Sequence, residues 1–164
     1  MKPCHLSAAI AVVSSGILSC GGSSGPSNTF GAQLTGANEV PAVSTTATGT
    51  VSLTLNGATV NYTVSATGLS GDARQSHIHV GPANSTGPVV VDFLAISPAP
   101  AGSATSFSGS FTAANIKNPT NPPLNPPVVT LDDLIAQIRA GNAYANIHTA
   151  AHTGGEIRGQ LAAQ

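Results

Sequence analysis

The side chains in this chain that are best suited to chemistry are two histidines separated by one residue. His77 and His79 lie in a segment typical of a strand, where alternate side chains point to the same face. His148 lies in a second such segment, and His152 follows it in a loop. An all-imidazole set without thiolate suits copper(II) or zinc, and copper is the tighter binder in the usual order. The sequence therefore predicts a metal site of His77, His79 and His148, with His152 as a further ligand.

The same region also fits a purely structural interpretation. Alternation places polar side chains on one face of two expected strands, at residues 143–148 and 156–162. If these strands pair, the side chains form a polar ladder in which the histidines donate to Glu156 or to loop carbonyls, and Glu156 pairs with Arg158. Such a network would satisfy buried polar groups and fix the strand register without a metal. Its expected members are Tyr144, Asn146, Glu156 and Arg158.

Composition narrows the classes of function. No serine or cysteine lies in a context typical of a catalytic nucleophile, which argues against a hydrolase. Only 7% of the residues are charged. The part of the chain after the first 29 residues has four basic and six acidic side chains, a net charge of −2. Because there is no basic patch, nucleic-acid binding has no electrostatic support.

The elements that must position these residues are mostly short strands. Alternating segments at 48–55 and 58–66 flank Asn56-Gly57, a strong hairpin signal. Residues 107–112 alternate in the same way, and the apolar run at 89–96 predicts a central strand.

One helix is expected, near residues 130–140. Thr130 and Asp133 resemble a capping box, apolar residues follow at helical spacing, and Gly141 is placed to end the helix. Many short strands, frequent turns and a single short helix predict an all-β fold, an antiparallel β-sandwich or barrel.

The beginning of the chain is typical of an export signal. Lys2 gives a positive start, and residues 6–18 form an apolar run too short to span a bilayer comfortably. The run ends just before Cys20, which a Gly/Ser-rich stretch follows. This pattern resembles a bacterial lipobox, in which Cys20 is the lipidated residue. The alternative is an ordinary secretory signal that is cut near Ser19 or Gly22.

We therefore expect a lipoprotein-type signal peptide at 1–19, a flexible tether at 20–29 and one folded domain at 30–164. The membrane is the expected partner, and the lipid on Cys20 would attach the domain to it. Glycine after that cysteine resembles the outer-membrane sorting pattern of a Gram-negative cell, so the domain would face the periplasm or the surface. Since no cysteine follows Cys20, the domain depends on its hydrophobic core rather than on disulfides.

Several motifs, in order, resemble one known family. They are residues 34–41 (LTGANEVP), 77–81 (HIHVG) with 87–90 (GPVV), and 140–149 (AGNAYANIHT) with 155–161 (GEIRGQL). Together they are similar to the CHRD domain, a domain named for its occurrence in chordin and found alone in exported bacterial proteins. The resemblance implies an immunoglobulin-like, Greek-key β-sandwich and export, and it implies no settled activity.

The resemblance covers residues 30–161, with one departure: the loop has Ala151-His152 where the family usually has Asn-Pro. The leading expectation is an exported, lipid-anchored binding or interaction module of the cell envelope with a His-ligated copper or zinc site. Two alternatives stay open. One is a copper-dependent oxidoreductase resembling superoxide dismutase, an analogy at the level of the fold. The other is a β-sandwich with a polar network and no metal.

Overall fold

A computed structural model describes residues 25–119 and 123–164. The signal peptide expected at 1–19, the lipidation site Cys20 and the first part of the expected tether lie outside the described residues. Within the described part of the chain, no helix is long and apolar enough to cross a membrane.

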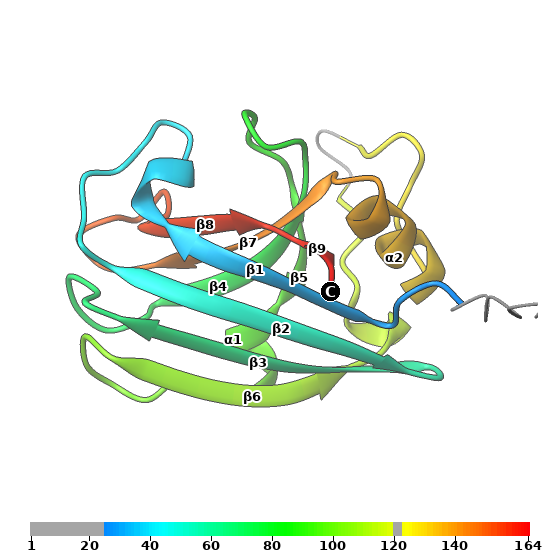
Figure 1. Ribbon diagram of the computed structural model, residues 1–164, viewed down its shortest axis with the longest axis horizontal. Helices are drawn as coiled ribbons and strands as arrows, with labels where there is room; N and C mark the ends of the chain where they lie inside the picture. The colour runs from blue at the N-terminus through cyan, green and yellow to red at the C-terminus, as the bar shows by residue number, and fades with distance from the viewer. Residues whose placement is uncertain (1–24, 120–122) are drawn as a thin grey trace, which may run out of the picture.

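The described residues form antiparallel strands that join into one sheet (Figure 1). The strands follow the order β5-β4-β7-β8-β1-β2-β3-β6, and β9 pairs with β1. Their bounds are β1 Thr29–Thr35, β2 Thr48–Asn56, β3 Thr59–Thr67, β4 Gln75–Val80, β5 Val89–Asp92, β6 Thr105–Phe111, β7 Ala143–His148, β8 Ile157–Gln160 and β9 Ala162–Ala163. The helical segments are η1 Gly36–Asn38, α1 Phe93–Ile96, η2 Ala113–Asn115 and α2 Leu131–Arg139.

The sheet is strongly curled, so that its two halves face each other as the layers of a sandwich do. The halves are linked along β1, which pairs with β8 at Thr35↔Arg158 and with β9 at Phe30↔Ala163 and Gly31↔Ala162. The predicted all-β antiparallel fold is confirmed.

The core lies between the two halves of the sheet. Val51 and Leu53 on β2 and Val64 on β3 are buried, as their alternation predicts. Tyr62 reaches across to α1: its ring lies 4.6 Å from that of Phe93, and its hydroxyl donates to the Phe93 carbonyl at 3.1 Å. Aromatic packing and a satisfied hydroxyl together hold the layers against each other.

Two predicted local elements are confirmed. The hairpin closes with Asn56 opposite Thr59, and Gly57 supplies the positive φ of the turn. Helix α2 has the expected capping box, in which Thr130 Oγ1 accepts from Asp133 N and the Asp133 carboxylate accepts from Thr130 N. Gly141 follows the helix with a φ of 73°, which favours glycine.

The prediction of a central strand over 89–96 is wrong. Strand β5 ends at Asp92, lies at one end of the strand order and pairs only with β4. The Asp92 carboxylate accepts from Ala95 N at 3.1 Å and caps the short helix α1. The capping interaction turns the chain into a helix although the sequence stays apolar.

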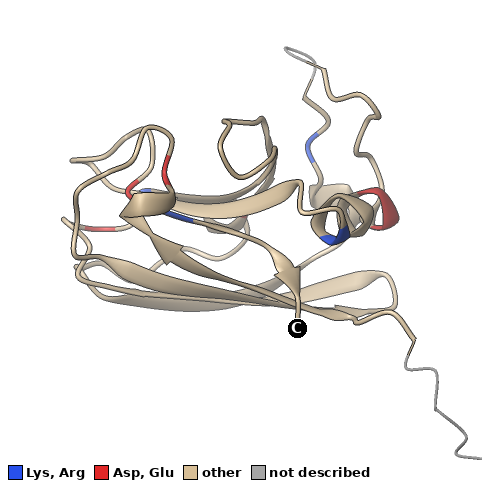
Figure 2. Cartoon of the chain, turned by 45° about the horizontal axis from the view of Figure 1, so that its top comes forward, with Lys and Arg blue, Asp and Glu red and all other residues tan. Residues whose placement is uncertain are grey.

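Charged side chains are few and spread over the described chain (Figure 2). Two surface ion pairs form among them, Arg74–Asp72 at 3.6 Å and Lys117–Asp92 at 3.3 Å. Exposed pairs of this kind stabilise a fold by at most about 1 kcal/mol. The fold therefore depends on its apolar core and its backbone hydrogen bonds.

The first described residues already contact the sheet. Leu55 N donates to Asn28 O at 2.8 Å, and Arg139 Nη2 donates to Ser27 O at 2.9 Å. Ser27 Oγ also donates to the backbone oxygen of Gln164 at 3.0 Å. The folded part thus begins inside the range expected for the tether, and the two ends of the described chain meet.

Candidate metal centre

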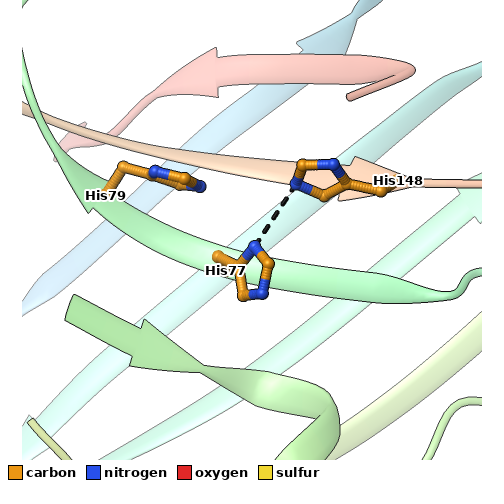
Figure 3. Close-up of side chains that lie close together, drawn as sticks. All are labelled: His77, His79 and His148. Atoms are coloured by element: carbon orange, nitrogen blue, oxygen red, sulfur yellow. Dashed lines mark hydrogen bonds between the residues drawn. The ribbon is translucent and has the colours of Figure 1, made fainter. Parts of the chain in front are cut away.

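Strands β4 and β7 bring three histidines together. In their antiparallel register His79 lies opposite Tyr144, His77 opposite Asn146, and Gln75 opposite His148. One ring nitrogen from each of His77, His79 and His148 lies within 4.8 Å of the other two (Figure 3). These three of the four predicted ligands are buried, with 7%, 8% and 7% of their surface exposed.

The histidines lie on the face of β4 and β7 that points away from the apolar core. Ile78, Ala145 and Ile147 occupy the other face and are fully buried. The histidine face is buried as well, because the loop of residues 81–88 hydrogen-bonds to the side chains on it. The curled sheet thus has a second, polar interior beneath this loop.

Gly87 fixes the ring of His79. Its carbonyl lies 2.7 Å from His79 Nδ1, and its N–H donates to the hydroxyl of Tyr144 at 3.1 Å. The imidazole and the Tyr144 ring are stacked, with centroids 4.6 Å apart and planes 5° apart. Because a carbonyl can only accept, His79 carries its proton on Nδ1 and keeps a lone pair on Nε2.

His148 is oriented in the same way by the loop that follows β7. Its Nδ1 donates to the Thr153 carbonyl at 2.9 Å, so Nε2 again keeps a lone pair. That nitrogen lies 3.3 Å from Nδ1 of His77, which donates to it. A backbone carbonyl on one ring nitrogen, with the other nitrogen free, is the usual support for a metal-binding imidazole.

The environment keeps the three rings neutral at pH 7. Burial, together with the proximity of His79 and His148, lowers the pKa of His77 to about 4. Burial also lowers the pKa of His79 to about 4, although its bond to Gly87 opposes the shift. The pKa of His148 is lowered by burial as well. Neutral imidazole is the form that binds metal.

Arg158 holds the covering loop in place. Arg158 lies opposite Asn146 in the register of β7 and β8. Its guanidinium carbon lies 3.3 Å from the centroid of the Tyr144 ring. Its Nη2 donates to the carbonyls of Pro82 and Ser85 at 3.0 and 2.9 Å. Guanidinium, phenol and the imidazole of His79 therefore form a three-layer stack beneath the loop.

Glu156 belongs to a separate network. Its carboxylate accepts from the hydroxyls of Thr45, Ser70 and Thr149 at 2.9, 2.7 and 2.7 Å. Burial opposes its ionisation, but these hydrogen bonds outweigh burial and lower its pKa. The expected bonds from histidine to Glu156, and the expected Glu156–Arg158 ion pair, do not form among the described residues.

The structure does not bring His152 into the cluster. Its side chain is half-buried in the loop after β7, and its backbone carbonyl accepts from Gly155 N at 3.1 Å. The candidate centre therefore consists of the three strand histidines.

These features define a class of protein, an all-β antiparallel module with three imidazoles buried on the polar face of its sheet. Residues 30–161 match the family model of the CHRD domain, so the chain belongs to the CHRD domain family. The match covers most of the chain and the range that the motifs indicated. No curated protein and no solved structure matches the chain.

Proposed function

We propose that this chain is an exported, lipid-anchored CHRD module of the cell envelope that binds one copper or zinc ion through His77, His79 and His148. The observation that carries the metal site is the convergence of three buried ring nitrogens within 4.8 Å. Because Nδ1 of each ring donates to the carbonyl of Gly87 or Thr153, Nε2 of His79 and of His148 carries a lone pair that can bind an ion; in the metal-free protein that of His148 accepts from His77 Nδ1.

The spacing of one pair of ring nitrogens, those of His77 and His148, suits a single tetrahedral ion, and all three nitrogens lie within 4.8 Å of one another. Metal–nitrogen bonds of about 2.0–2.1 Å place the ligand atoms of a tetrahedral site about 3.3 Å apart. His77 Nδ1 and His148 Nε2 are already 3.3 Å apart. For His77 to bind through Nδ1, its proton must move to Nε2, and Asp92 lies opposite His77 on β5.

A network without metal accounts less well for His79. Its Nε2 is buried and has no hydrogen-bond partner among the described residues. A buried polar atom left without a partner costs about 1–3 kcal/mol. A metal ion supplies the partner that this nitrogen lacks.

Metal binding is tested by titrating the apo protein with copper(II) and zinc(II) while its thermal unfolding is followed. A ligand at 100 times its dissociation constant stabilises a protein by about 2.7 kcal/mol. We expect the melting temperature to rise with one or both ions, and the rise to be lost in the His77→Ala/His79→Ala double variant. His152→Ala, a histidine outside the cluster, is the matched control and should keep the rise.

The absence of a shift with either ion in the wild-type protein would support the structural network. A shift that persists in the double variant would place the ion elsewhere. The competing class, a copper-dependent oxidoreductase, needs in addition an open coordination position and superoxide turnover above that of free copper.

The anchor is supported by the apolar run at 6–18 and by the Gly/Ser-rich stretch that follows Cys20. In cell fractions, the wild-type protein should sediment with membranes, and Cys20→Ser should move it to the soluble exported fraction. Cys4→Ser, in the expected signal, is the control and should leave the distribution unchanged. A wild-type protein that is already soluble after export would indicate an ordinary secretory signal instead.

A further inference from the structure

Two buried acceptor atoms in the histidine cluster have no hydrogen-bond partner. They are Nε2 of His79 and Oδ1 of Asn146. Only four buried side-chain atoms of the described residues share this property, and the other two, on Glu39 and Gln160, belong to residues outside the cluster. Two orphaned acceptors in one small polar interior indicate that a group binding both is missing from the protein chain itself.

Asn146 occupies the middle of the cluster. On β7 it lies directly opposite His77 and two residues before His148, so its side chain is on the histidine face. Directly opposed residues have Cβ atoms about 4.5–5.5 Å apart. The side chain is 3% exposed, so bulk water does not satisfy its amide oxygen.

The amide of Asn146 also lies beside His79. It lies within side-chain hydrogen-bonding reach of that ring. The Nδ1 atom of the ring donates to the Gly87 carbonyl at 2.7 Å, so the lone pair lies on Nε2. Nε2 and Oδ1 therefore present lone pairs to a shared space, which is the arrangement that a cation resolves.

We propose that Oδ1 of Asn146 is the fourth ligand of the ion held by His77, His79 and His148. The inference rests on the proposed function and completes it, because three imidazoles and one amide oxygen make a closed set of four neutral donors. Structural metal sites are closed in this way, whereas catalytic sites keep a position for water or substrate. The geometry points to a module that holds its ion rather than one that reacts at it.

The test compares Asn146→Ala and Asn146→Asp with Asn61→Ala, an exposed asparagine on β3. Each variant is titrated with copper(II) and zinc(II), and cobalt(II) is used as a probe whose visible spectrum depends on its ligands. We expect Asn146→Ala to weaken binding roughly tenfold or more and to change the cobalt spectrum as water replaces the amide. Asn146→Asp should retain or tighten binding, because carboxylate oxygen is a metal ligand, and Asn61→Ala should match the wild-type protein.

Three outcomes would overturn the assignment. An Asn146→Ala variant with wild-type affinity and spectrum, when His148→Ala no longer binds, would reject Asn146 and leave the three-histidine site intact. Binding lost equally in Asn146→Ala and Asn146→Asp would show that the amide donates to His79 through Nδ2 instead of binding the ion. A wild-type protein that binds none of the three ions would reject the proposed function together with this ligand.

Discussion

At the scale of single residues, Gly87 shapes the site through its backbone, although it has no side chain. A Cβ atom built on it would lie 1.9 Å from the Val80 carbonyl oxygen, which is backbone and cannot yield easily. Its carbonyl accepts a hydrogen bond from His79, and its N–H donates one to Tyr144. A glycine at this position is required by the close approach of the loop to β4.

Gly87→Ala should therefore destabilise the protein by about 1–3 kcal/mol, as forced overpacking does, and should release the ring of His79. Urea unfolding measures the first effect, and NMR of the imidazole nitrogens measures the second. Gly71→Ala, where an added Cβ meets nothing within 4 Å, should change stability by less than about 0.5 kcal/mol. Equal effects of the two substitutions would show that the loop is not held as described.

Alternation predicted that His77 and His79 share a face, because period two is a property of the strand itself. It placed His77 and His79 on one face, and the structure shows His148 beside them. Alternation failed for Glu156, because β8 begins only at Ile157 and the side chain before it turns to other partners. The carbonyls that orient the rings were not predictable, because distant loops supply them and any residue type has a carbonyl.

At the scale of elements, the sequence was most informative where the signal is local. Helix α2 and the β2–β3 hairpin each follow from adjacent residues, a capping box in one and an Asn-Gly turn in the other. The segment 89–96 was assigned wrongly because its apolar run fits both a buried strand and a helix, and Asp92 decided between them.

The contacts of the loop of residues 81–88 could not be predicted from the sequence. Its Gly, Pro, Asn and Ser residues predict a loop and nothing more. In the structure Arg158 and Gln160 on β8 donate to its carbonyls, and His79 on β4 donates to another. The two contacts from β8 join residues 76 and 79 positions apart, so the burial of the polar face is a consequence of topology.

For the whole molecule, the burial of neutral imidazole rings leads us to expect that the metal-free protein loses stability in acid. The pKa of His77 and His79 is about 4 in the folded protein, against about 6.5 in an unfolded chain. Between these values the unfolded chain binds protons that the folded protein excludes, so the free energy of unfolding falls as the pH drops from about 6.5 to 4. Urea midpoints at pH 7 and pH 5 measure this loss.

Glu39 has the opposite effect on the pH dependence of stability. Burial raises its pKa to about 7, although the charge of Arg158 opposes the shift, so folding favours its protonated form between about pH 4.5 and 7. Glu39→Gln should therefore make the loss of stability between pH 7 and pH 5 steeper than in the wild-type protein. A Glu39→Gln protein whose midpoint stays constant over this range would show that the histidines are not buried as neutral rings.

The meeting of Ser27 with Gln164 determines how the domain can be joined to other structures. Gln164 N also donates to Thr29 O at 3.0 Å, so entry and exit of the chain share one corner of the sheet. The two ends of the described chain therefore leave the domain side by side and not from opposite ends. A partner fused at either end would occupy that same corner of the domain.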